Sequence, residues 1–207
     1  MPTSQSTQTA ACPSCGLNYQ CICAHRPMLD STTQIALLTH PNETRRVTNT
    51  GKLLTHSLPN CQVHIWDRVN PPVELVKQIA EQPSYLLFPS EEAIEVSVLQ
   101  ASINTNESQS SPLFIILDGT WQEAKKMLNK NPWLQTLPKV VLSSEQTSNY
   151  RLRRNQEVGN LCTCEVGISL LQQLEPQNDF SSLQQYFELF LKVYEADRQH
   201  RVLTARD

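Results

Sequence analysis

The chain has 207 residues and a mass of 23.5 kDa, enough for one medium domain with a small appendage. Hydrophobic residues make up 39% and charged residues 18%, which is typical of a soluble globular protein and excludes fibrous, collagenous and wholly disordered classes. The formal net charge of -3 excludes a global attraction to nucleic acid or anionic membranes, so any RNA binding has to come from a local patch.

The first eleven residues are mostly Ser, Thr, Gln and Ala without periodicity, which predicts a disordered tail over 1–11. They lack the basic start and the apolar stretch of a secretory signal. No run approaches the ~20 apolar residues that a membrane helix needs. We therefore expect a cytoplasmic protein with no membrane partner.

Residues 12–27 hold four of the seven cysteines in the pattern C-x2-C-x5-C-x-C. Four thiolates complete a closed tetrahedral zinc site, which would order a segment too poor in apolar residues to build its own core. An iron–sulfur cluster uses the same ligands, and incidental cysteines in a flexible tail or a redox pair are further alternatives. We expect a structural zinc segment whose ligands are Cys12, Cys15, Cys21 and Cys23.

From residue 34 onward, short apolar runs alternate with amphipathic stretches, which indicates an α/β fold with a mainly parallel sheet flanked by helices. We assign 28–207 to this unit. The run LFIIL has the continuous apolar character of a buried parallel strand. The predicted strands are 35–39, 63–66, 85–88, 113–117 and 139–143, and the predicted helices are 50–57, 73–81, 91–101, 120–130, 162–174 and 181–199.

Ligands of open α/β sheets bind at the carboxyl ends of the strands, so the loops that begin there carry the most information. In the first loop, 40–54, Thr50 and Gly51 precede an apolar helical turn. The start of this helix offers backbone N–H groups to an anionic ligand. Plain helix capping by hydroxyl groups explains the same residues.

The second loop follows the most apolar strand and contains Asp118, Gly119 and Trp121. A carboxylate at this position can act as a general base or orient a ligand, and Trp121 can stack on a base or pack against the sheet. The alternative for Asp118 is a simple helix cap.

The third loop spans 148–167 and is the strongest basic and aromatic cluster of the chain. Arginines with a tyrosine can bind RNA phosphates and stack bases, but they can also form a solvated face paired with Glu145 and Glu157. The small residues of LCTCEVG would let a ligand approach the backbone. The cluster consists of Tyr150, Arg151, Arg153 and Arg154.

Taken together, these motifs resemble the DTW-domain proteins, which are tRNA-uridine aminocarboxypropyltransferases. The Asp-x-Thr-Trp motif is present at 118–121, and the cysteine cluster, TNTG, YRLRR and LCTCE stand around it in the family's order. The resemblance covers about residues 12–175. Five motifs in this order are highly specific.

The resemblance implies a SPOUT-like fold with a C-terminal trefoil knot and S-adenosylmethionine as co-substrate. It also implies that the 3-amino-3-carboxypropyl group passes to N3 of a tRNA uridine, giving acp3U and 5′-methylthioadenosine.

The resemblance implies roles for particular residues as well. Asp118 is the candidate base for the uridine N3 proton, and the flipped uridine would stack on Trp121 or Tyr150. Arg151, Arg153 and Arg154 would hold tRNA phosphates or the carboxylate of the co-substrate. The residues expected to bind S-adenosylmethionine are Thr50, Gly51, Gly119, Thr120, Leu161, Cys162, Thr163 and Glu165.

Two alternatives stay open at the level of sequence. One is an S-adenosylmethionine-dependent RNA methyltransferase on the same fold. The other is a zinc-containing RNA-binding module without catalysis, against which the acidic net charge counts modestly.

Overall fold

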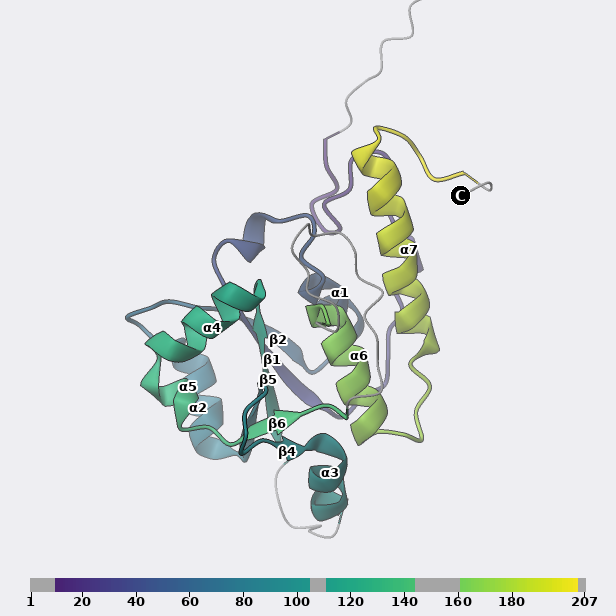
Figure 1. The fold of residues 1–207 in the computed structure, drawn as a ribbon. Coiled ribbons are helices and arrows are strands. Elements are labelled where there is room, and N and C mark those ends of the chain that lie inside the picture. Colours follow the sequence, from purple (N-terminus) through teal and green to yellow (C-terminus); the bar gives the residue numbers. More distant parts are fainter. Residues whose placement is uncertain (1–9, 105–110, 144–160, 205–207) are drawn as a thin grey trace, which may run out of the picture.

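The computed structural model describes residues 10–104, 111–143 and 161–204. Its centre is a six-stranded sheet in the order β2-β1-β5-β3-β6-β4, in which every pair of neighbours is parallel. The predicted α/β class is therefore confirmed (Figure 1). The strands are β1 (Gln34–Thr39), β2 (Cys61–Ile65), β3 (Ser84–Leu87), β4 (Ile94–Glu95), β5 (Leu113–Asp118) and β6 (Lys139–Val141).

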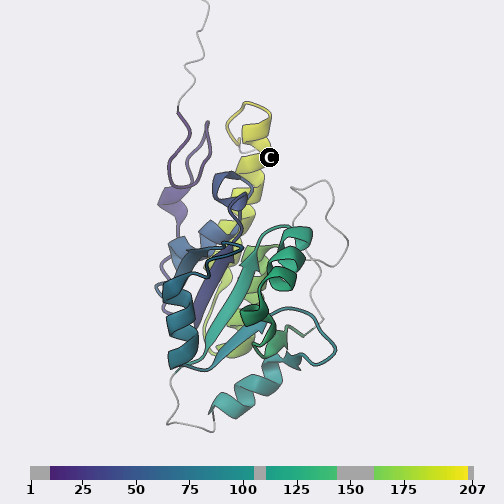
Figure 2. The same ribbon diagram turned by 90° about the vertical axis from the view of Figure 1, so that its left-hand side faces the viewer.

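Helices cover both faces of the sheet (Figure 1 and Figure 2). Two 3-10 turns, η1 (Cys23–His25) and η2 (Glu43–Arg45), precede them in the N-terminal part. The α-helices are α1 (Gly51–Ser57), α2 (Val73–Glu81), α3 (Val96–Asn104), α4 (Trp121–Lys130), α5 (Pro132–Gln135), α6 (Thr163–Leu174) and α7 (Ser181–Arg198).

Strand β5 shows why the sheet is covered on both sides. All six of its residues are buried, and successive side chains point to opposite faces. Phe114 and Ile116 pack with α1, α3, α6 and α7, whereas Ile115 and Leu117 pack with α2, α4 and α5. Within the described ranges, no helix has both the length and the apolar character to cross a membrane.

A close approach between α1 and α6 brings the ends of the two helices to the same edge of the sheet. A Cβ atom on Gly167 would lie 2.5 Å from Leu54 Cδ1, so any larger residue would require the Leu54 side chain or the helices to shift. This contact places the first turn of α6 next to the end of β5.

The predicted elements agree with the structure except around β4 and α5. The helix predicted over 91–101 begins only at Val96, because Ile94 and Glu95 pair with β6 as a short strand. The four residues of α5 are too few to show a helical period in the sequence.

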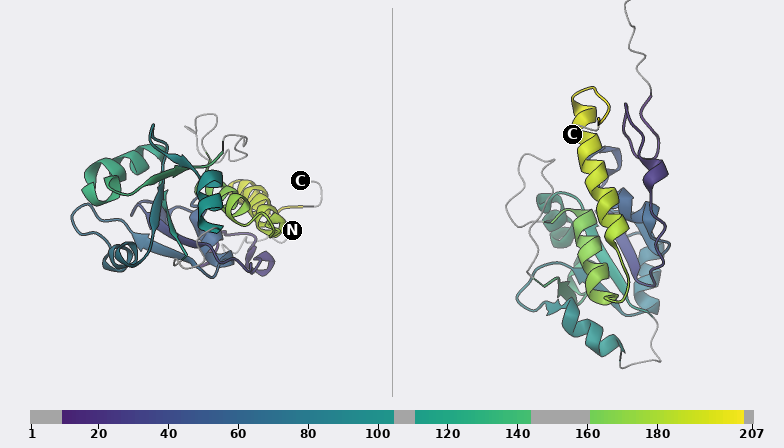
Figure 3. Two further views of the ribbon diagram at one scale, coloured as in Figure 1. Left: turned by 90° about the horizontal axis from the view of Figure 1, so that it is seen from below. Right: turned by 90° about the vertical axis from the view of Figure 1, so that its right-hand side faces the viewer.

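The cysteine segment has no core of its own and packs onto the domain beside α7 (Figure 3). Cys15, Leu17 and Ile22 are fully buried in the same apolar cluster as Phe187. The Asp197 carboxylate of α7 accepts hydrogen bonds from the segment's Asn18–Tyr19 turn. The segment is therefore docked on the α1 and α7 side of the sheet.

Two predictions about the chain's organisation reach beyond the described residues. Of the tail predicted over 1–11, only residues 10 and 11 are described, and both are exposed. The connection between β6 and α6 lies largely in 144–160, outside the described residues, so the trefoil knot stays a prediction.

Candidate functional site

Asp118 lies at the end of β5, opposite Thr39 at the end of β1 in the strand register. Its carboxylate is 3% exposed and accepts three hydrogen bonds. Thr39 Oγ1 and Asn49 Nδ2 donate to Oδ2 at 3.0 and 2.7 Å, and Thr163 Oγ1 donates to Oδ1 at 2.7 Å. One carboxylate thus joins β1, the loop before α1 and the start of α6.

The loop before α1 is held in this arrangement by Asn49. Its Oδ1 accepts from the Lys52 backbone N–H at 3.2 Å, so Asn49, rather than a hydroxyl, caps the helix. Thr50 Oγ1 instead accepts from the Cys164 backbone N–H of α6 at 3.2 Å. A Cβ on Gly51 would lie 3.1 Å from the Asp118 carboxylate. The anionic group at this helix start is therefore the protein's own Asp118.

The start of α6 forms the third part of the site. Cys162 and Glu165 make a capping box, in which the Cys162 backbone N–H donates to Glu165 Oε2 at 2.8 Å. This cap fixes Thr163, whose hydroxyl reaches Asp118. Three segments singled out in the sequence, TNTG, DGTW and LCTCE, therefore meet around one carboxylate.

The environment of Asp118 raises its pKa. Burial is the main cause, and the nearby Glu43 carboxylate adds to it. The hydrogen bonds from Asn49, Thr163 and Thr39 act in the opposite direction without cancelling the shift. A carboxylate with a raised pKa is a stronger base, which is the property a proton acceptor needs.

A second charged network lies beside Asp118 and escaped the sequence interpretation. Arg46 makes ion pairs with both Glu43 and Glu123. Burial raises the pKa of Glu123, but hydrogen bonds from Thr120, Arg46 and Asn42 lower it to about 2. Thr120 and Glu123 also form a capping box, a spacing that the sequence does display. The network fixes the helix that follows the Asp-x-Thr-Trp motif.

A cavity of about 330 Å³ opens next to Asp118, within the size range of small-molecule sites. Leu37 and Thr39 of β1 line it together with Asp118, and Gly51 is the one predicted co-substrate residue on its wall. Ser14 and Gly16 of the cysteine segment also line the cavity. The cysteine segment and the buried carboxylate thus border one space.

Trp121 occupies the first turn of α4 and is 36% exposed. Its ring stacks on Phe88, with centroids 5.1 Å apart, and Lys125 Nζ lies 4.9 Å from its centroid. Of the two roles considered for Trp121, packing beside the sheet is present in the structure. Tyr150, Arg151, Arg153 and Arg154, the predicted RNA-binding residues, lie outside the described residues.

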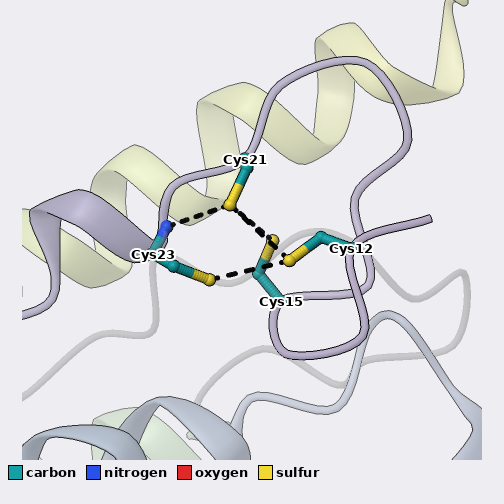
Figure 4. A group of neighbouring side chains, drawn as sticks. All are labelled: Cys12, Cys15, Cys21 and Cys23. Atoms are coloured by element: carbon teal, nitrogen blue, oxygen red, sulfur yellow. Dashed lines mark hydrogen bonds between the residues drawn. The ribbon is translucent and has the colours of Figure 1, made fainter. Parts of the chain in front are cut away.

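The four predicted metal ligands come together (Figure 4). Their Sγ atoms all lie within 4.8 Å of one another, with separations of 3.8 Å for Cys12 and Cys23 and 4.0 Å for Cys15 and Cys21. Tetrahedral zinc with Zn–S bonds of about 2.3 Å requires sulfur atoms about 3.8 Å apart, so the residues fit zinc.

Backbone geometry supports the same site. Gly16 adopts a φ of +76°, which favours glycine, directly after Cys15. Its N–H donates to the Cys12 carbonyl at 2.8 Å and closes the turn that joins the first two ligands. Backbone N–H groups of Cys15 and Ser14 lower the pKa of Cys12 to about 6, which favours the thiolate. Figure 4 shows the N–H of Cys23 directed at Cys21 Sγ.

The remaining cysteines have a different environment. Burial raises the pKa of Cys61 to about 12, and it also raises the pKa values of Cys162 and Cys164. Across the described parts of the chain, the four N-terminal cysteines are the only group of three or more side chains placed to share a metal ion.

The fold and site define an α/β protein whose parallel sheet carries a buried carboxylate at its carboxyl edge and whose N-terminal segment can bind a metal ion through four cysteines. The family model of the DTW domain matches residues 9–195. The chain belongs to the DTW domain family, which confirms the resemblance seen in its motifs.

Three curated relatives are named tRNA-uridine aminocarboxypropyltransferase 2. The protein from Mus musculus is 28% identical over 187 residues, and that from Macaca fascicularis is 27% identical over the same length. Both alignments cover 86% of this chain and 61% of the relative, so the chain spans less than two thirds of those proteins. The relative from Drosophila melanogaster is 27% identical over 149 residues, or 70% of this chain and 57% of its own length. No solved structure matches the chain significantly.

Proposed function

We propose that this protein transfers the 3-amino-3-carboxypropyl group of S-adenosylmethionine to N3 of a uridine in tRNA. Membership of the DTW domain family and the name shared by its relatives support the proposal. The observation that carries it is the convergence of three family motifs on the buried Asp118 carboxylate beside a cavity.

Asp118 is the proposed general base. Uridine N3 carries a proton at neutral pH and becomes a nucleophile as that proton leaves. Three hydrogen bonds hold the carboxylate in one orientation, and its raised pKa favours proton acceptance. In the proposed step the N3 proton passes to Asp118 while the bond from N3 to the transferred carbon forms. When bound, the sulfonium of S-adenosylmethionine supplies the leaving group, 5′-methylthioadenosine.

The co-substrate is proposed to bind around the same carboxyl edge of the sheet. Gly51 faces Asp118 without a side chain, and Thr50 links the loop before α1 to the first turn of α6. These contacts hold the proposed residues in a fixed relative position, as alignment of three reacting atoms requires. The proposed set is Thr50, Gly51, Gly119, Thr120, Leu161, Cys162, Thr163 and Glu165.

tRNA is proposed to bind at the same edge. Trp121 is 36% exposed and is a proposed contact for a flipped base, and Lys125 adds a positive charge beside it. Tyr150, Arg151, Arg153 and Arg154 remain the proposed partners of RNA phosphates. Zinc in the cysteine segment is proposed to be structural, since four protein ligands leave no position for substrate.

Mass spectrometry of the small-molecule products tests this function. The protein is incubated with S-adenosylmethionine and tRNA that lacks the modification. We expect 5′-methylthioadenosine to accumulate with tRNA present and at background level without it. S-adenosylhomocysteine as the tRNA-dependent product would make the protein a methyltransferase. Neither product, with tRNA binding retained, would support a binding module.

A further inference from the structure

Lys52 lies in the first turn of α1 and connects this helix to the cysteine segment. Its Nζ donates to the carbonyl of Cys15 at 2.6 Å and to the carbonyl of Val47 at 2.9 Å. The same ammonium lies 5.1 Å from the centroid of the Phe190 ring on α7. The side chain therefore contacts a metal-ligand residue, the loop before α1 and α7 at once.

The backbone of Lys52 is connected to Asp118. Its N–H donates to Asn49 Oδ1, and the Nδ2 of that same amide donates to Asp118. The preceding residue, Gly51, packs directly against the Asp118 carboxylate. Lys52 therefore contacts Cys15 directly and is linked to Asp118 through one intervening side chain, that of Asn49.

The charge of Lys52 suits this position. Zinc with four thiolates carries a formal charge of about -2, and partners outside the ligand set help to hold such a group. The Lys52 ammonium, hydrogen-bonded to the Cys15 carbonyl, places a positive charge beside the turn that holds Cys12 and Cys15. It does so without itself bonding to their sulfur atoms. A neutral side chain would leave two partly buried carbonyl groups without this donor.

We propose that Lys52 is a positioning residue that couples the four-cysteine site to Asp118. A metal ion fixes Cys15, the Cys15 carbonyl fixes Lys52, and Lys52 fixes the Asn49 amide that orients the carboxylate. Coupling is reciprocal: removal of the metal loosens the start of α1, and loss of the Lys52 ammonium weakens metal binding. The part of the proposal that concerns turnover rests on the proposed transferase function, whereas the metal-binding part does not.

The first test measures the rate at which the zinc-loaded full-length protein loses zinc to a chelator. We expect Lys52→Met to release zinc about tenfold faster or more, because loss of a partner outside the ligand set usually weakens metal affinity by at least about that factor. The matched control is Lys77→Met on the exposed face of α2, which should release zinc at the wild-type rate. Equal rates for wild type and Lys52→Met would overturn the proposal.

The second test uses the unmutated protein, so it is independent of how Lys52→Met folds. Amide hydrogen exchange is followed over 51–57 with zinc bound and after its removal. We expect exchange of the α1 amides to accelerate on zinc removal, while the amides of β5 stay protected. Unchanged protection of α1 would overturn the coupling whether or not the protein is a transferase.

The third readout separates positioning from a general loss of structure. In the transferase assay, Lys52→Met should lower kcat and leave KM for tRNA near the wild-type value, and Lys52→Arg should restore part of kcat because it keeps the charge and its donors. Equal loss in both variants would contradict the role of the charge. Absence of transfer by the unmutated protein would refute the proposed function and leave the zinc and exchange tests valid.

Discussion

The sheet around Asp118 and the four-cysteine segment obtain their order from different sources. Every residue of β5 is buried between two helical layers, so apolar burial places Asp118. The cysteine segment adds only a few buried side chains to the core. Its other contacts are among its four sulfur atoms, with the Asp197 carboxylate and with Lys52. An apolar scaffold thus carries the carboxylate, and a segment that can bind a metal ion through four cysteines lines part of its cavity.

The largest expected effect disrupts the cysteine segment and leaves the sheet intact. Replacing Cys12 and Cys15 by Ser should abolish metal binding, a contribution on the order of 10 kcal/mol for structural zinc, and should leave the sheet folded. Metal analysis by mass spectrometry and hydrogen exchange over 12–27 measure the two effects. Cys61→Ala is the control and should retain the metal. Less than one zinc or iron per chain in the unmutated protein would refute the closed metal site.

The second-largest expected effect is a loss of turnover with the cysteine segment intact. Asp118→Asn should lower kcat by roughly 10²- to 10⁴-fold, because the amide cannot take a proton. Zinc content should not change. The amide would also face donors on Thr39, Asn49 and Thr163, so a modest drop in melting temperature is expected. Asp67→Asn at an exposed turn is the control. Near wild-type turnover would remove Asp118 from the role of base.

A smaller effect is expected from weakening the contact between the cysteine segment and α7. The Asp197 carboxylate accepts hydrogen bonds from the backbone N–H groups of Asn18 and Tyr19, each at 2.8 Å. Asp197→Ala should weaken the docking of the segment by about 2 kcal/mol, the usual magnitude for hydrogen bonds to a charged group. Exchange of these two amides should accelerate while β5 stays protected. Equal acceleration in β5 would show that the two regions unfold together.

The smallest expected effect lies in the body of the domain and depends on pH. Burial raises the pKa of Glu175, but hydrogen bonds from the 31–33 segment and Asn178 lower it overall. A lowered pKa stabilises the fold at pH values above the unfolded value and loses this contribution as pH falls through the folded value. Glu175→Gln should cost on the order of 1 kcal/mol at neutral pH, and less in acid. Denaturant unfolding at several pH values checks this, and a constant difference would contradict it.

Much of the fold could be predicted because its signals are local. The apolar run of β5 and the amphipathic period of α2 lie within single segments, and α2 has the predicted bounds. β4 could not be predicted, since two residues form a strand only by pairing with β6. The convergence of Asp118 with the loops before α1 and α6 was expected from the parallel topology and from the family resemblance.

The contacts within the site were less predictable. Thr50 resembles a cap of α1 in the sequence, but its hydroxyl accepts a hydrogen bond from α6, whose Gly167 packs closely on Leu54 of α1. Arg46 and Lys52 were not singled out from the sequence, because Glu123 and the Cys15 carbonyl, which connect them to other parts of the fold, lie 77 and 37 positions away. Hydrogen bonds between residues far apart in the chain produce no periodic pattern in the sequence.

The most direct test of the proposed function follows two isotopic labels of S-adenosylmethionine, one in the methyl group and one in the aminocarboxypropyl chain. The protein is incubated with each labelled form and with unmodified tRNA, and the tRNA is then recovered. We predict that the aminocarboxypropyl label enters the tRNA and that the methyl label stays in 5′-methylthioadenosine. Methyl label in the tRNA, with the other label left in the small molecule, would contradict the proposed transfer.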